Sequence, residues 1–317
     1  MAELRCVIRM VGGLGNQLFQ YALGRALEAE LSAGVCYDVS QYSLPGERSL
    51  SISKLRARLA TPSTADRASM RLCFGRTLRK LRPLLGLVCP PAVWRVYSDP
   101  NQGFDPTVRQ LRGRWYLLGW WQCPQYFERI RPKLLEEFQP AQELTGQNLD
   151  IKRQIDDVNS VCVHVRRGDL VNAPPNSRGI SSSANLVQSS SFYHAAMAEI
   201  CRRVDEPHFF VFSDDAGWAR QNIRCDAPMT YVASNGRQED YLDLHLMSSC
   251  RHFITANSTF SWWGAWLCKN ADKIVIVPPV WAKDGSGPPA GLIPDGWQIG
   301  PAMEEGAAAT AAIEAGL

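Results

Sequence analysis

The sequence predicts an α/β fold made of two Rossmann-type domains. Short apolar strand candidates alternate with segments of helical period along most of the chain, which is the pattern of parallel sheets with crossover helices. The chain has 317 residues, 45% of them hydrophobic, and this is enough for two domains with separate cores. A polar segment with Pro and Gly at residues 139–150 is typical of a linker. We therefore expect domains at 1–150 and 151–301.

Local sequence patterns predict the individual strands and helices. The first half opens with a strand at 4–10, a glycine turn, a helix over 16–31 and a second strand at 35–39. The second half has predicted strands at 160–165, 208–213, 229–233, 252–256 and 273–279, and predicted helices at 192–203, 216–223, 238–249 and 259–269. Residues 172–191 form a long Ser-rich loop, and residues 302–317 read as a flexible tail of low complexity.

Charge and composition limit the partners. A formal net charge of +3 gives no reason to expect a nucleic-acid partner. The stretch 67–95 is basic and interleaved with leucines, so it is either a solvated helix face beside a core stripe, which we favour, or a surface for a membrane or an anionic lipid-linked substrate. The ten cysteines are scattered without a CxxC pair and predict reduced thiols. No uncharged apolar run reaches the ~18 residues that span a bilayer, so we expect a cytoplasmic location.

The stretch "HVRRGDL" (164–170) places Arg166, Arg167 and Asp169 directly after a predicted strand. In an open parallel sheet, ligands bind beyond the carboxyl ends of the strands. An arginine there is suited to a diphosphate because its planar fork stays ionised and donates paired hydrogen bonds. The alternative is a surface ion pair between Arg166 and Asp169.

The stretch "ANSTFSWWGAWL" (256–267) follows another strand and opens a helix. Ser258, Thr259 and Ser261 would lie at the helix N-terminus, where free N–H groups and the helix dipole attract anions. Ordinary N-capping by Ser258, with the aromatic residues in the core, is the alternative and is compatible with phosphate binding.

The stretch "FSDD" (212–215) places Asp214 and Asp215 after a third strand. A carboxylate there can accept hydrogen bonds from the N1–H and exocyclic amine of guanine, or it can cap the following helix. The spacing of Asp240, Asp243 and His245 fits one face of a helix only loosely. We expect these side chains to lie at the surface or in packing contacts rather than around a metal ion. We therefore expect no metal site.

The stretch "GGLGNQLFQYALGRAL" (12–27) has Gly13 and Gly15 between a strand and a helix, as in a dinucleotide-binding turn. Leu18 occupies the place of the third glycine and weakens that interpretation. Asn16 and Gln17 instead supply amides able to bind sugar hydroxyls or a phosphate.

In order and spacing, "GGLGNQLFQYALGRAL", "HVRRGDL", "FSDD" and the longer stretch "LMSSCRHFITANSTFSWWGAWL" (246–267) resemble the α-1,2-fucosyltransferases, mainly the bacterial members of glycosyltransferase family eleven. The likeness covers residues 5–280. It implies a GT-B-like pair of Rossmann-type domains facing a cleft, with the acceptor on the N-terminal side and the GDP-sugar on the C-terminal side. It also implies GDP-L-fucose as donor, inversion at the anomeric carbon, no metal cofactor, and transfer to the 2-hydroxyl of a terminal β-galactoside.

The resemblance also implies roles for single residues. Arg166 would bind the β-phosphate, and His164 and Asp214 would contact the nucleoside. The other residues that it assigns to donor binding are Gly13, Gly15, Asn16 and Gln17, across the cleft near the transferred sugar, and Ser258, Thr259, Phe260 and Ser261, around the diphosphate and base.

The general base and the acceptor are the open points. Asp169 is the nearest carboxylate in its motif, so it is the candidate base, but it could instead orient Arg167 or cap the loop. The Ser-rich loop departs from the family pattern and leaves the acceptor open. Related bacterial enzymes suggest an O-antigen or capsule acceptor, and the basic stretch 67–95 would suit a lipid-linked one at the inner membrane.

Three other functions remain as alternatives. A transferase could use another GDP-sugar or another acceptor. An NAD- or FAD-dependent oxidoreductase would use the first glycine turn but leaves Arg166 unexplained. A non-catalytic carbohydrate-binding protein would use the ten tryptophans for stacking but needs no diphosphate pocket.

Overall fold

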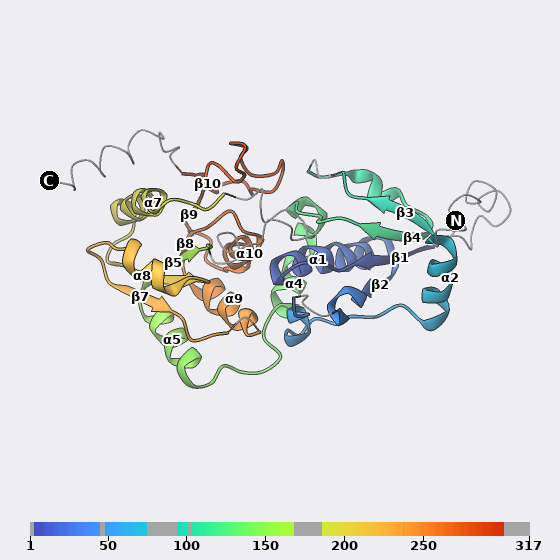
Figure 1. Cartoon of the computed structure of the whole chain (residues 1–317), viewed down its shortest axis with the longest axis horizontal. Coiled ribbons are helices and arrows are strands. Elements are labelled where there is room, and N and C mark those ends of the chain that lie inside the picture. The colour runs from blue at the N-terminus through green and yellow to red at the C-terminus, as the bar shows by residue number, and fades with distance from the viewer. Residues whose placement is uncertain are drawn as a thin grey trace. The chain divides into compact units, whose positions relative to one another are not determined.

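The computed structural model describes residues 3–44, 48–74, 94–100, 103–167, 186–236 and 238–300. By its internal contacts the chain divides into two compact units (Figure 1). The N-terminal unit is Met1–Glu143 together with Pro289–Pro294, and the C-terminal unit is Leu144–Pro288 together with Asp295–Leu317. The return of Pro289–Pro294 to the N-terminal unit has no signal in the sequence pattern.

The N-terminal unit contains a four-stranded sheet in the order β2-β1-β4-β3, with every neighbouring pair parallel. Its strands are β1 (Leu4–Arg9), β2 (Gly34–Asp38), β3 (Arg95–Ser98) and β4 (Gly113–Leu118). Its helices are α1 (Leu14–Leu31), α2 (Thr64–Phe74) and α4 (Arg131–Glu137). Short 3-10 turns lie at Ser40–Ser43, Ser51–Lys54, Pro106–Gln110, Pro124–Tyr126 and Glu128–Ile130.

The C-terminal unit contains a six-stranded parallel sheet in the order β10-β9-β8-β5-β6-β7. Its strands are β5 (Asn159–Val165), β6 (Pro207–Ser213), β7 (Met229–Val232), β8 (His252–Ile254), β9 (Val275–Val277) and β10 (Gln298–Ile299). Its helices are α5 (Gly146–Asp157), α7 (Ser190–Arg203), α8 (Ala216–Asn222), α9 (Asp240–Ser249) and α10 (Thr259–Leu267). Numbered within the unit, the strands run third, second, first, fourth, fifth, sixth, which is the Rossmann order.

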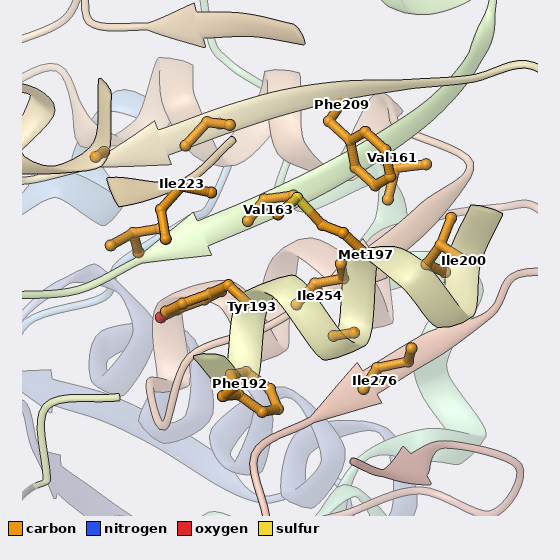
Figure 2. Packing of buried hydrophobic residues seen from close by; sticks show 14 of the residues in the cluster. Val161, Val163, Phe192, Tyr193, Met197, Ile200, Phe209, Ile223, Ile254 and Ile276 are labelled. Atoms are coloured by element: carbon orange, nitrogen blue, oxygen red, sulfur yellow. The ribbon is translucent and has the colours of Figure 1, made fainter. Parts of the chain in front are cut away.

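The core of the C-terminal unit forms because β5 is buried on both faces. Val161 and Val163 point toward α7 and meet Tyr193 and Met197 of that helix (Figure 2). The alternate residues of β5 point to the opposite face, because successive side chains of a strand alternate. His164, one of these alternates, meets Phe260 of α10 there. The apolar runs that predicted these strands are therefore continuous because the sheet has helices on both faces.

The predicted α/β class and the two Rossmann-type parallel sheets of a GT-B-like protein are confirmed. The expected strands at 4–10 and 35–39 correspond to β1 and β2, and all five predicted strands of the second half are present within a few residues. The linker predicted at 139–150 is partly wrong, because α5 begins at Gly146. Within the described residues, no helix is both long and apolar enough to cross a membrane.

Candidate active site

The main candidate site lies at the carboxyl edge of the C-terminal sheet, between β5 and β8. These strands are neighbours, although β6 and β7 come between them along the chain, so the strand order reverses at this point. Ligands of open α/β sheets bind at such a switch point, beyond the carboxyl ends of the strands. The first residues after β5 include Arg166, and the segment after β8 leads to Ser258.

Arg166 and Ser258 are in direct contact across this switch point. The guanidinium Nη1 of Arg166 donates a hydrogen bond to Ser258 Oγ at 3.2 Å. The same hydroxyl oxygen accepts from the backbone N–H of Phe260 at 3.3 Å and caps α10. Ser258 is 2% exposed. Capping and arginine contact therefore coexist in one residue. A fixed cation lies beside the positive end of a helix dipole, an arrangement that attracts an anion.

The other predicted residues of the α10 segment differ in exposure. Thr259 and Phe260 are half-buried, and the Phe260 ring lies 5.7 Å from the His164 ring at an interplanar angle of 51°. Ser261 is buried, and its hydroxyl donates to the carbonyl oxygens of Ser258 at 3.2 Å and Ala256 at 3.5 Å. Ser261 thus fixes the helix start, whereas Thr259 and Phe260 retain exposed surface.

The two aspartates of "FSDD" have different contacts. Asp214 Oδ1 accepts from the backbone N–H of Arg167 at 2.8 Å, so it holds the first residues after β5. Asp215 Oδ1 accepts from the backbone N–H of Trp218 at 3.0 Å and caps α8. The capping role that the sequence leaves open for this pair therefore belongs to Asp215.

Arg167 is held on its own side of the site. Its guanidinium carbon lies 3.9 Å from the centre of the Trp218 ring, a cation–π contact, and its Nε lies 3.8 Å from Asp215 Oδ2. The hydroxyl of the buried Tyr193 lies near this segment: burial raises the pKa of Tyr193, the charge of Asp214 raises it further, and Arg167 opposes the shift. Because of these contacts, Arg167 and Arg166 have different surroundings.

Asn257 is a further residue of this site, and the sequence pattern predicted no role for it. It is 5% exposed, and its Nδ2 donates to the carbonyl oxygens of Leu186 and Trp281, both at 2.7 Å. Its Oδ1 is buried and has no hydrogen-bond partner among the described residues. Asn257 therefore joins the strand-to-helix turn to two segments distant in sequence, and its position next to Ser258 was the signal that could have found it.

The glycine turn of the N-terminal unit is built around buried amides. The backbone of Gly12 has φ +84°, and a Cβ on Gly13 would lie 2.9 Å from Nη1 of Arg48. Gln17 is fully buried, donating to the carbonyl oxygens of Gly12 and Ser49 and accepting from the N–H of Ile52. Its amide therefore fixes the turn, and any contribution to sugar binding is indirect.

Gly15 and Asn16 lie in the first turn of α1. Gly15 is buried and Asn16 is half-buried. Asn16 Oδ1 accepts from Gln122 Nε2 at 3.1 Å, a partner that follows β4 and that the sequence did not indicate. Of the amides predicted here, that of Asn16 is the one with exposed surface.

Several predictions fall on residues that the structure does not describe. Asp169, most of the Ser-rich loop at 172–191, the tail 302–317 and most of the basic stretch 67–95 lie outside the described residues. Their predicted roles stay predictions.

The acidic residues of α9 belong to packing. Asp243 Oδ1 accepts from Asn235 Nδ2 at 2.6 Å, and burial raises the pKa of Asp243 to about 7, with the charges of Asp240 and Glu239 adding to the shift. Burial lowers the pKa of His245 to about 4. In the described part of the chain, no group of three or more His, Cys, Asp or Glu side chains is arranged to hold a metal ion.

Comparison with known proteins identifies the family. Residues 106–286 match the model of glycosyl transferase family 11, and an α-1,2-colitosyltransferase from Escherichia coli is 32% identical over 87% of this chain and 91% of its own length. The chain belongs to glycosyl transferase family 11. The family match includes the Arg166 and Ser258 segments, and the predicted enzyme class, a glycosyltransferase, is confirmed.

Other relatives of this family 11 protein extend the comparison. The O-antigen biosynthesis glycosyltransferase WbnK of Escherichia coli is 29% identical over 85% of this chain and 92% of its own length. Galactoside α-(1,2)-fucosyltransferase 2 of Bos taurus is 25% identical over 82% of this chain and 68% of its own length. Among solved structures, a mutant of Arabidopsis thaliana FUT1 in complex with GDP aligns with 84% of this chain and 69% of its own at 11% identity and a TM-score of 0.46.

Proposed function

We propose that this glycosyltransferase moves L-fucose from GDP-L-fucose to the 2-hydroxyl of a terminal β-galactoside, with inversion at the anomeric carbon. The observation that carries the proposal is the contact of Arg166 with Ser258 at the switch point between β5 and β8. It joins a permanent positive charge to the N-terminus of α10, which suits the diphosphate of a sugar nucleotide. The galactoside α-(1,2)-fucosyltransferase among the relatives supports the donor and the linkage.

The proposed reaction is a displacement at the anomeric carbon. The acceptor hydroxyl oxygen forms the new bond, the bond from that carbon to the β-phosphate oxygen breaks, and its electron pair leaves with GDP. Arg166 and the start of α10 stabilise the charge that develops on the phosphate, because they are fixed before the reaction begins. These groups thereby take the place of a metal cation. We propose that the reaction is metal-independent.

The remaining roles are part of the same proposal. Asp169 accepts the proton of the acceptor hydroxyl. His164 and Asp214 contact the nucleoside, and Thr259 and Phe260 border the diphosphate and base. The C-terminal unit binds the GDP-sugar, and the N-terminal unit serves the acceptor, with its glycine turn acting near the transferred sugar.

The biological acceptor that we propose is a β-galactoside of a surface polysaccharide. The O-antigen glycosyltransferase WbnK among the relatives supports it. Such an acceptor would be lipid-linked, with the enzyme cytoplasmic and peripheral at the inner membrane.

A colitosyl donor is the second candidate, because the relative with 32% identity is named an α-1,2-colitosyltransferase. The Arg166 contact serves either donor equally, since it concerns only the diphosphate. Turnover with each donor therefore decides between the two candidates.

The test is turnover of the purified protein with lactose and either GDP-L-fucose or GDP-colitose, in EDTA and again with added Mg²⁺. GDP release gives the rate, and NMR gives the linkage. Formation of 2'-fucosyllactose in EDTA supports donor, linkage and metal independence together. A preference for GDP-colitose replaces the donor, and GDP release without a galactoside product replaces the acceptor. Absence of both turnover and GDP binding would reject the diphosphate site.

A further inference from the structure

The carboxyl edge of the N-terminal sheet also brings together two segments that are distant in sequence. Strands β1 and β4 are parallel neighbours although β2 and β3 lie between them along the chain. Ligands of open parallel sheets bind beyond the carboxyl ends of the strands. The residues that follow these two strands are the glycine turn into α1 and the segment 119–122.

The segment after β4 is held in a conformation that few residues adopt. Trp121 has φ +57°, in the left-handed region, and its fully buried ring lies 6.2 Å from that of Tyr97 and 5.8 Å from that of Tyr126. Asp99 Oδ2 accepts from the backbone N–H groups of Trp120 at 3.2 Å and Trp121 at 2.8 Å. Strain of this kind persists where the surroundings fix it, and it concentrates at functional sites.

Gly119 fixes this segment further. A Cβ on Gly119 would lie 2.1 Å from the Cβ of Asp99, so only glycine allows Asp99 to approach. The carbonyl oxygen of Gly119 also accepts from Gln20 Nε2 of α1 at 3.2 Å. The segment 119–122 is therefore held in place against the first turns of α1.

Two amides meet at this edge. Gln122 Nε2 donates to Asn16 Oδ1 at 3.1 Å, and both side chains are half-buried. This bond leaves the Asn16 NH2 group and the Gln122 carbonyl oxygen without hydrogen-bond partners among the described residues. A donor and an acceptor thus lie side by side, which suits sugar hydroxyls because each hydroxyl both donates and accepts.

Trp120 belongs to the same segment as Gln122, two residues before it, and supplies an aromatic surface. Unlike the buried Trp121, it is half-buried, and it makes no ring contact with the described residues. Ligand sites combine aromatic surface with a few placed polar groups, and an aromatic ring packs well against the C–H face of a pyranose. We propose that Trp120, Asn16 and Gln122 form the subsite that binds the terminal galactose ring of the acceptor.

This inference rests on the proposed function and deepens it. It gives Asn16 an acceptor contact. Asp99 is a positioning residue that acts through the backbone of Trp120 and Trp121. The subsite recognises a neutral pyranose through one ring face and two amide groups.

The experiment compares full-length wild-type protein with Trp120→Ala, Trp120→Phe and Gln122→Glu, measuring separate KM values for lactose and for GDP-L-fucose. We expect Trp120→Ala to raise the lactose KM by about tenfold, Trp120→Phe to restore most of it, and the donor KM to stay within about twofold. Gln122→Glu keeps the shape but removes the NH2 group that bonds Asn16, so it too should raise only the lactose KM.

Trp115→Phe is the matched control, because Trp115 lies toward the amino end of β4, the strand that precedes Trp120. It should leave both KM values unchanged. A lactose KM within about twofold of wild type in Trp120→Ala would overturn the subsite. So would equal rises of both KM values in that variant at unchanged melting temperature. If wild-type protein itself fails to use lactose, the proposed acceptor is wrong, and that result is separate from a failure of the variants.

Discussion

The two sheets place different chemistry at equivalent positions. Each is parallel, and each has its first strand beside a strand from later in its unit. At the carboxyl edge of the C-terminal sheet, Arg166 reaches a serine that caps a helix. At the carboxyl edge of the N-terminal sheet, the amides of Asn16 and Gln122 bond each other, Trp120 lies two residues before Gln122, and Arg48 packs against Gly13.

This difference matches two kinds of ligand. A diphosphate needs fixed positive charge and free N–H groups, which the first edge supplies. A neutral sugar needs paired donors and acceptors and an aromatic surface, which the second edge supplies. In this proposal, the strand ends give the location of each site, and the residues that follow them give its chemistry.

The largest effect is expected from Arg166→Ala. Removing a fixed donor from the developing charge should lower kcat by about 10²–10³-fold, or ~3–4 kcal/mol. GDP release under saturating substrates measures it. Arg202→Ala, an exposed arginine of α7 in the same unit, is the control and should keep wild-type turnover. Near-wild-type kcat in Arg166→Ala would remove the diphosphate role from this edge.

A smaller effect is expected from Trp218→Ala, which removes the ring beneath the Arg167 guanidinium. Because Arg167 is held from its own side of the site, we expect kcat to fall only about tenfold, consistent with the loss of one cation–π contact. Trp218→Phe should recover part of the loss. A loss as large as that of Arg166→Ala would show that Arg167 contacts the donor itself.

Salt should separate the two edges further. Raising ionic strength from about 0.05 to 0.5 M shortens the screening length severalfold, so the KM for GDP-L-fucose should rise several-fold while that for lactose stays level. The donor dependence should flatten in Arg166→Ala. An equally steep salt dependence in that variant would mean that other charges attract the diphosphate.

Asp243 should make the stability of the C-terminal unit depend on pH. The pKa of Asp243 is raised to about 7, so folding favours its protonated form. The stability it gives is fully present below pH 4 and is lost as pH rises to 7. Asp243→Asn keeps an oxygen for Asn235 and removes the charge, so it should stabilise the protein by about 1–3 kcal/mol at pH 8 and hardly at pH 4.

Calorimetry of both proteins at several pH values measures this difference. The contribution of His245 has the opposite pH dependence. Because the pKa of His245 is lowered to about 4, the stability that it gives is lost as pH falls from 6.5 to 4. The wild-type profile alone would therefore hide the two contributions, and only the substitution separates them. A melting temperature difference that is independent of pH would contradict the assignment to Asp243.

Two of the predicted strands, β5 and β6, are almost completely buried. β5 and β6 are continuous apolar runs because helices pack on both faces. β3 and β4 were missed because "RVYS" and "GRWYLL" carry arginines and are mostly half-exposed, so they lack both alternation and a continuous apolar run. α5 was missed because Thr145 and Gly146 read as part of a linker.

The candidate site was predictable in the residues that follow strands, and less so in their partners. Arg166 and Ser258 were identified separately, each from its own strand end. Their contact depends on β5 lying beside β8, across 92 positions of sequence. No site role was predicted for Gln122 and Trp120, because the sequence pattern did not predict β4, the strand before them.

The segment Pro289–Pro294 has a consequence for biosynthesis. Leu292 is fully buried, and a Cβ on Gly291 would lie 3.2 Å from the Sγ of Cys123, so this short piece is packed into the N-terminal unit. The ribosome makes it only after β9, when most of the C-terminal unit has emerged. The N-terminal unit, whose strands are made before those of the C-terminal unit, is therefore completed only near the end of synthesis. Nascent chains that stop before residue 289 carry an unfinished N-terminal core.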